Sequence, residues 1–88
     1  MPTISMFYGI IVRMYYAPKE HPPPHFHVYY GDYHATVGIE DCEIRDGQLP
    51  SRQRKLELAW AELHRDALLA NWELLMNGEP AFQIDPLK

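Results

Sequence analysis

The sequence predicts an α+β fold, in which two C-terminal helices pack on one face of an antiparallel sheet of three or four strands. Three observations predict it. Apolar and polar residues alternate in the first half of the chain, a Gly31-Asp32 pair separates two β-like runs, and apolar residues recur at helical spacing after Pro50. The chain has 88 residues, the size of one domain, so we expect residues 1–88 to form a single domain.

The first predicted strand spans residues 4–16. Its even-numbered residues are almost all apolar, so we expect them to face the core. They are Met6, Tyr8, Ile10, Val12, Met14 and Tyr16. Arg13 then lies on the other side, and if this strand pairs with the next one, Arg13 shares a face with His25 and His27. A guanidinium there could hold a phosphate or a carboxylate, or it could simply cover its aromatic neighbours with its aliphatic stem.

The next two predicted strands, at about 25–30 and 33–39, form a hairpin. Pro22, Pro23 and Pro24 cannot donate ladder hydrogen bonds and favour an extended arm, so the first of these strands begins near His25. A two-residue type II′ turn at Gly31-Asp32 aligns the two strands and separates their faces. The core face carries Phe26, Val28, Tyr30, Tyr33, Ala35 and Val37, and the other face carries His25, His27, Tyr29, His34, Thr36 and Gly38.

The imidazoles on the non-core face are candidates for chemistry. His25 and His27 are two residues apart on one strand, and His34 is diagonal to His27, at a Cα separation of roughly 7–8 Å. Three such nitrogens make a workable zinc set with an open fourth position, behind which Tyr29 or Thr36 could serve as outer partners. His25 and His27 could instead exchange protons as general acid and base. A third alternative is surface histidines that contact water or a partner, since no HExxH spacing or Cys pair accompanies them.

After the hairpin, the sequence predicts a short strand at about 43–45, which Asp46-Gly47 closes. Helices are predicted at about 51–64 and 66–77. Their apolar stripe consists of Leu56, Ala59, Trp60, Leu63, Ala67, Leu68, Trp72 and Leu75. One continuous helix of about 26 residues would be roughly 39 Å long, which is long for so small a domain. We therefore expect a break near His64-Arg65.

The ends of these helices carry recognisable signals. Ser51 follows Pro50 and is the expected N-cap of the first helix, and Asp66 can cap the second. Asn77-Gly78 predicts the stop of the second helix.

Basic residues crowd the start of the first predicted helix. Arg52, Arg54 and Lys55 lie where the helix dipole disfavours cations by about 1 kcal/mol or less each. A helix N-terminus with added cations would bind an anion well, such as an RNA phosphate or the acidic surface of a partner. The alternative is a solvated basic edge whose charge is balanced by Glu57 and Glu62.

Composition limits the choice of function. The net charge of −4 weighs against broad electrostatic capture of nucleic acid. No run approaches the length of a membrane span, and the N-terminus does not read as a signal peptide. The single Cys42 can form no internal disulfide, which fits a reducing cytoplasm.

The segments MPTISMFYGIIVRMYY, HPPPHFHVYYGDYHATV and WAELHRDALLANWELL resemble a bacterial family catalogued as domain of unknown function 4160. The resemblance covers nearly the full length and implies a small cytoplasmic α+β protein. Members are often halves of two-gene modules beside another small family of unknown function, numbered 2442. Such pairs are suspected toxin–antitoxin systems, and some members carry labels as transcriptional regulators. The residues that match the motif one by one are His21, Pro23, Pro24, His25, Phe26 and His27, whereas His34 falls where the family often has an acidic residue.

Two functional hypotheses follow. The leading one is an interaction module of a toxin–antitoxin-like pair, which binds a small protein from a neighbouring gene, and RNA in addition, through the histidine face, Tyr29, Arg13 and the edge from Arg52 to Lys55. The rival is an enzyme. It would be a ribonuclease with His25 and His27 as acid and base and Arg13 on the phosphate, or a hydrolase whose zinc is held by His25, His27 and His34.

Overall fold

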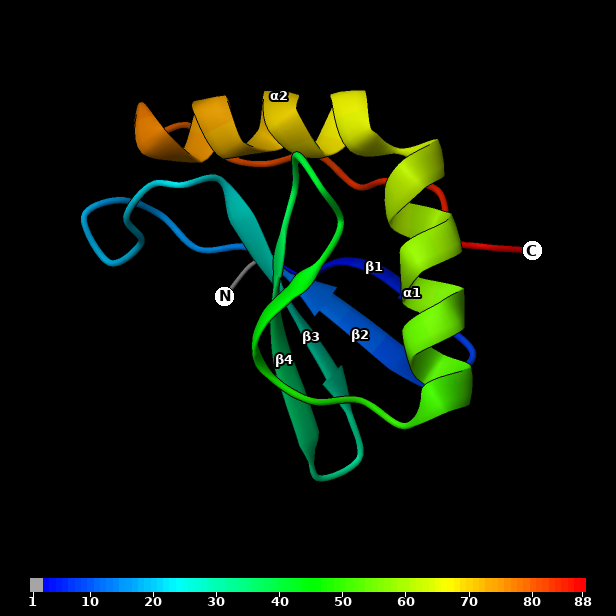
Figure 1. Ribbon diagram of the computed structural model, residues 1–88. Helices are drawn as coiled ribbons and strands as arrows, with labels where there is room; N and C mark the ends of the chain where they lie inside the picture. Colours follow the sequence, from blue (N-terminus) through cyan, green and yellow to red (C-terminus); the bar gives the residue numbers. More distant parts are fainter. Residues whose placement is uncertain (1–2) are drawn as a thin grey trace.

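The computed structural model describes residues 3–88, so Met1 and Pro2 of the predicted single domain lie outside the described residues. A five-stranded antiparallel sheet precedes two helices, which confirms the α+β class (Figure 1). The elements are β1 (Thr3–Phe7), β2 (Ile10–Arg13), β3 (His25–Tyr30), β4 (Tyr33–Gly38), β5 (Ile44–Gly47), α1 (Ser51–Leu63) and α2 (Arg65–Met76). Neighbours in the chain are neighbours in the sheet, in the order β1-β2-β3-β4-β5.

The fifth strand arises because the strand expected at 4–16 is in fact a hairpin. Tyr8 and Gly9 have φ angles of 49° and 78°, and two successive positive φ angles are the signature of a type I′ turn. Phe7 pairs with Ile10 across this turn, and both are buried. The turn therefore directs Phe7 toward the core and Met6 away from it. The prediction that Met6 and Tyr8 face the core is wrong, because both residues are exposed, at 62% and 54%. Ile4 is nevertheless buried, since the register shifts between Thr3 and Ser5.

The hairpin of β3 and β4 has the predicted register. Tyr30 pairs with Tyr33 and His27 pairs with Thr36, and Gly31 has the positive φ that a type II′ turn requires at its first central position. The predicted core face is buried at Phe26, Val28, Ala35 and Val37. Tyr33 is the exception, since it lies at the tip of the hairpin and is exposed.

The last strand is displaced from its predicted range of 43–45. Asp46 and Gly47 belong to β5, where they pair with Thr36 and Ala35 of β4, instead of closing the strand. Backbone pairing with β4 therefore extends the strand over Asp46 and Gly47, which local turn propensity assigns to a loop.

The two helices break at His64, as predicted, and cross at a wide angle (Figure 1). Their N-caps differ from the prediction. Pro50 caps α1 without a side-chain hydrogen bond, so Ser51 is the first helical residue, and His64 precedes α2, so Asp66 lies within its first turn. The predicted stop is confirmed, since α2 ends before Gly78, which has a φ of 78°.

The core lies between one sheet face and both helices (Figure 1). Sheet residues Ile4, Phe7, Ile10, Val12, Phe26, Val28, Ala35 and Val37 pack with Trp60, Ala61, Leu68 and Leu75 of the helices. The buried stripe of α1 is rotated from the prediction, because Leu63 is 71% exposed while Glu57 is buried. Within residues 3–88, neither helix has the length and apolar character needed to cross a membrane.

The C-terminal tail returns along the helices and closes one edge of the core. Asn71 of α2 donates a hydrogen bond to the Phe82 carbonyl and accepts one from the Phe82 amide. The Trp60 indole donates to the carbonyl of Asp85, and the amide of Ile84 donates to the carbonyl of Ile4. The tail therefore ties both helices to the outer strand of the sheet.

Candidate functional site

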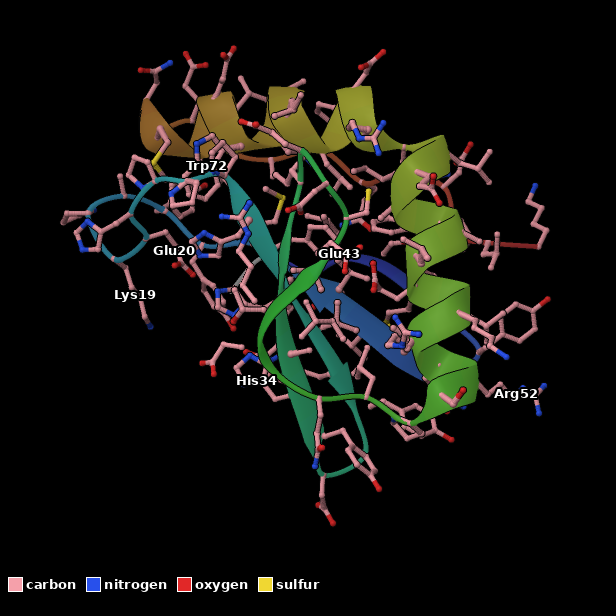
Figure 2. All side chains as sticks on the ribbon, viewed as in Figure 1. Lys19, Glu20, His34, Glu43, Arg52 and Trp72 are labelled. Carbon is pink, nitrogen blue, oxygen red and sulfur yellow. The ribbon has the colours of Figure 1, made fainter. Side chains whose placement is uncertain are left out.

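The connection between β2 and β3, residues 14–24, carries Glu20 toward the histidines of β3. The amide of Ala17 donates to the Leu75 carbonyl at 3.3 Å, which holds this loop against α2. Residues 22–23 form a bend and not the extended arm that their prolines suggest. Glu20 consequently lies on the same side of the molecule as Trp72 and His34 (Figure 2).

Glu20 joins two histidines through its two carboxylate oxygens. Its Oε2 lies 2.8 Å from Nε2 of His25, and its Oε1 lies 2.5 Å from Nε2 of His27. The three side chains are only 13–15% exposed. One carboxylate oxygen of Glu20 and one ring nitrogen of each histidine lie within 4.8 Å of one another, close enough for a single metal ion to bind all three residues.

The outer nitrogens of both histidines also have partners. Nδ1 of His25 donates to the carbonyl of Pro23 at 2.9 Å. Nδ1 of His27 lies 3.2 Å from Nε2 of His34, whose ring stacks on that of His27. Both rings are therefore fixed in orientation with Nε2 directed at Glu20.

Aromatic side chains surround the cluster of Glu20, His25 and His27. The ring of His25 packs on Trp72 of α2 with a centroid distance of 5.1 Å, and the ring of His27 meets the edge of Tyr15 at 5.0 Å. Lys19 lies over the Tyr15 ring, 5.2 Å from its centroid. These contacts surround the carboxylate and the imidazoles with aromatic rings from the loop and α2, which leaves them only slightly exposed.

The environment shifts the acid–base properties of these groups. Burial alone would raise the pKa of Glu20, but hydrogen bonds from His25 and His27 outweigh burial and lower its pKa. Burial lowers the pKa of His27, despite the neighbouring Glu20.

Arg13 lies on the same sheet face as His27, as expected if the first two predicted strands pair. It lies directly opposite His27 in the β2–β3 ladder, and its Nε donates to the Thr3 hydroxyl at 3.3 Å. Its guanidinium carbon lies 5.2 Å from the centroid of the Tyr29 ring. The side chain is thus held over the sheet by an aromatic neighbour and a hydroxyl.

Tyr29 is itself tightly held. Its ring stacks on His34 with a centroid distance of 4.5 Å and an interplanar angle of 4°, and its hydroxyl shares a hydrogen bond of 2.8 Å with that of Tyr15. Burial and this hydrogen bond raise the pKa of Tyr29 to about 12. The phenol therefore remains protonated at neutral pH.

Residues 9–73 match the model of a protein family described as Domain of unknown function (DUF4160). The chain belongs to this family. No curated protein and no solved structure matches the chain. The DUF4160 region extends from β2 into α2, so it includes Glu20, the three histidines of the hairpin and Trp72.

The structure divides the predicted metal candidates of this DUF4160 chain into two positions. His25 and His27 converge on Glu20, whereas His34 contacts the far nitrogen of His27. Sequence reasoning missed Glu20, because a single carboxylate in a proline-rich loop shows no periodicity. The available signal was its position one residue before the HPPPHFH segment, which keeps it within reach of both histidines.

The predicted basic edge lies elsewhere. Arg52, Arg54 and Lys55 are exposed at the start of α1, and Figure 2 shows Arg52 far from Glu20. Glu57, which a solvated edge would use as a counter-charge, is 1% exposed, and its burial raises its pKa to about 8. The basic edge at the start of α1 therefore lies apart from the histidines of β3 and β4.

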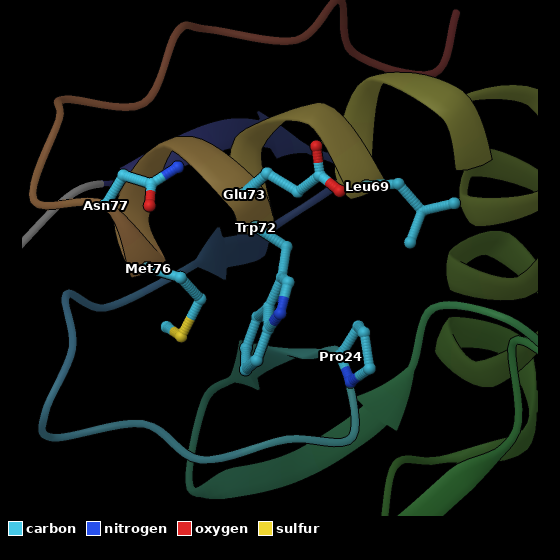
Figure 3. Close-up of a pocket in the computed structure, with 6 residues that line it drawn as sticks. All are labelled: Pro24, Leu69, Trp72, Glu73, Met76 and Asn77. Carbon is cyan, nitrogen blue, oxygen red and sulfur yellow. The ribbon is translucent and has the colours of Figure 1, made fainter.

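An open groove of about 510 Å³ adjoins the cluster on the α2 side (Figure 3). It is lined by Pro24, Leu69, Trp72, Glu73, Met76 and Asn77. Trp72 is shared by both features, since its ring lines the groove and packs on His25. A ligand in this groove would therefore lie next to the histidine cluster.

Proposed function

We propose that this protein is an interaction module that binds a small protein partner, as one half of a toxin–antitoxin-like pair, through the sheet face opposite the helices. The observation that carries the proposal is an ordered set of side chains on that face, which we call the open face. A first cross-strand row consists of Met6, Ile11, Tyr29 and His34, and a second row consists of Thr3, Arg13, His27, Thr36 and Asp46.

The chemistry of the open face suits a protein partner. Met, Tyr and Arg are enriched in protein interfaces. Met6 and Tyr29 lie on either side of Ile11 in the first row, and Arg13 lies over the ring of Tyr29. The net charge of −4 and the distance of the Arg52–Lys55 edge from this face weigh against RNA as the main ligand. The resemblance to members of two-gene modules supports a partner encoded by the neighbouring gene.

Co-purification with the neighbouring gene product tests this proposal. The wild-type chain is expected to form a stable complex, and Met6→Glu, which places a charge in the first row, is expected to lose it. Leu63→Glu is a matched control, because Leu63 is similarly exposed but lies at the end of α1. The proposal fails if no complex forms, if Met6→Glu binds normally, or if the chain captures RNA instead.

A second candidate function, a metal-dependent hydrolase, is supported by the geometry around Glu20. A metal-free ribonuclease would need free imidazole nitrogens on either side of the scissile bond, but both Nε2 atoms of His25 and His27 are occupied by one carboxylate. A metal ion held there would activate water, with Arg13 beside His27 to bind a phosphate. Toxicity on expression that disappears in a folded His27→Ala variant would support this candidate, and unchanged toxicity would exclude it.

A further inference from the structure

We infer that Glu20, His25 and His27 form a binding site for one divalent transition-metal ion, with His34 as an outer partner that orients His27. The site combines one carboxylate from the β2–β3 loop with two imidazoles from β3. The inference goes beyond partner binding. It shares His27 and His34 with the open face, but Glu20 and His25 lie outside the two rows, so Glu20→Gln tests the metal site and Met6→Glu tests the partner surface.

The first argument is convergence. Two Nε2 atoms approach the two oxygens of one carboxylate, at 2.8 Å for His25 and 2.5 Å for His27. Around a tetrahedral ion, metal–ligand distances of about 2.0–2.2 Å place ligand atoms about 3.3–3.6 Å apart. A shift of Glu20 by roughly 0.5–1.1 Å would therefore admit an ion. Glu20 belongs to a loop and not to a strand or helix, so its side chain can make this adjustment.

The second argument is the pattern of hydrogen-bond donors and acceptors around the ring of His25. Its Nδ1 faces a carbonyl oxygen, that of Pro23, which only accepts hydrogen bonds. The neutral ring therefore carries its proton on Nδ1, and the lone pair of Nε2 points at Oε2 of Glu20. Two acceptors in contact repel each other unless a proton or a metal ion lies between them. A histidine whose Nδ1–H donates to a backbone carbonyl is also the usual form of a metal ligand.

The third argument is that His27 has the same arrangement. Its Nε2 faces Glu20 and its Nδ1 faces Nε2 of His34, which can accept the Nδ1 proton. Both potential ligands thus have an outer partner and a fixed ring orientation, the two features that accompany metal-binding histidines. His34 does not face Glu20, so it is assigned this outer role and not that of a third ligand.

The fourth argument is burial. Three ionisable side chains lie 13–15% exposed between Trp72 and Tyr15, where removing them from water is costly. A divalent cation would offset this cost, because it would neutralise the charge of the carboxylate and accept the Nε2 lone pairs of His25 and His27.

The donor set indicates the class of ion. Two imidazoles and one carboxylate suit Zn²⁺, Fe²⁺, Co²⁺ and Ni²⁺ better than Ca²⁺ or Mg²⁺, which prefer oxygen ligands. Three protein ligands leave at least one position for water or another ligand, as in catalytic zinc sites.

Titration of the untagged, chelator-treated protein with Zn²⁺, followed by calorimetry, tests the inference, and Co²⁺ serves as a second probe through its visible absorption. The wild-type chain is expected to bind one equivalent. The isosteric variant Glu20→Gln should lose tight binding, and His34→Ala should weaken it by roughly 10- to 100-fold, as expected for an outer partner. His21→Ala is the matched control, because His21 is an exposed histidine in the same loop, and this variant should bind normally.

Two results would overturn the inference. One is the absence of stoichiometric binding to the wild-type chain, which would identify the cluster as a histidine–carboxylate ion pair. The other is unchanged binding in Glu20→Gln together with complete loss in His34→Ala, which would assign the ion to a set of three histidines. Circular dichroism of each variant distinguishes a lost ligand from a lost fold. Neither result bears on the complex with the neighbouring gene product, which Met6→Glu tests separately.

Discussion

Oε1 of Glu20 lies 2.5 Å from Nε2 of His27. This contact connects the loop of residues 14–24 to strand β3. His27 is also the backbone partner of Arg13 in the β2–β3 ladder, and its other ring nitrogen contacts His34. Any ligand that uses Nε2 of His27 must therefore displace Glu20 or share it. This single contact makes the loop part of the site.

Zinc should stabilise the fold if it binds at Glu20. A ligand that binds only the native state, at about 100 times its Kd, adds roughly 2.7 kcal/mol to the free energy of unfolding. For a domain of this size, that corresponds to a rise of roughly 10–20 °C in Tm. Differential scanning fluorimetry should show this rise for the wild-type chain and for His21→Ala but not for Glu20→Gln. An equal rise in Glu20→Gln would contradict a site at Glu20.

Glu57 should make the fold less stable as pH rises. Its side chain is 1% exposed, its Oε2 has no hydrogen-bond partner within residues 3–88, and burial raises its pKa from 4.5 to about 8. Between these values the folded chain holds a proton that the unfolded chain has released. The free energy of unfolding should therefore fall by roughly 1.4 kcal/mol per pH unit over this window.

Urea unfolding across the same pH range measures this slope. Glu57→Gln should remove most of the decline, because an amide does not titrate. Glu62→Gln, an exposed glutamate on the same helix, should leave it in place. A slope that persists in Glu57→Gln would show that another group causes it.

Alanine substitutions at Gly47 and Gly78 should distinguish the stability cost of backbone strain from the cost of a steric clash. Both have a φ of 78°, but a Cβ at Gly47 would overlap the carbonyl oxygen of His34, whereas nothing lies within 4 Å of a Cβ at Gly78. Gly78→Ala should cost about 1–2 kcal/mol from conformation alone. Gly47→Ala should cost clearly more, because the neighbouring backbone of β4 must move. Equal losses in urea unfolding would mean that β5 shifts freely.

Asn71 should control the docking of the C-terminal tail. Its buried amide makes hydrogen bonds of 2.9 and 3.0 Å with both backbone groups of Phe82. Asn71→Ala leaves these groups without partners, at a cost of about 1–3 kcal/mol. Amide hydrogen exchange at Ile84 should accelerate, and Gln83→Ala, which removes an exposed contact to Thr3, should have a smaller effect. Unchanged exchange in Asn71→Ala would place the anchor of the tail elsewhere, for example at Trp60.

Local signals in the sequence were sufficient for the elements that local interactions determine. The register of β3 and β4 follows from the Gly31-Asp32 turn and strict alternation, so the sharing of one face by His27 and His34 was predictable. The break at His64 and the stop before Gly78 were predictable for the same reason. In each case, the information lies within a few residues of the feature.

Tertiary structure decided what depends on contacts between distant segments. The run of residues 4–16 looks continuous because apolar residues occur on both sides of Tyr8-Gly9, and only packing of Phe7 beside Ile10 selects the turn. Glu57 is buried because α1 rotates to place Trp60 in the core. Glu20 reaches His25 and His27 because contacts between the loop and α2 bend the chain back over β3. Composition and periodicity report burial and local geometry, but they do not report which loop side chain meets which strand.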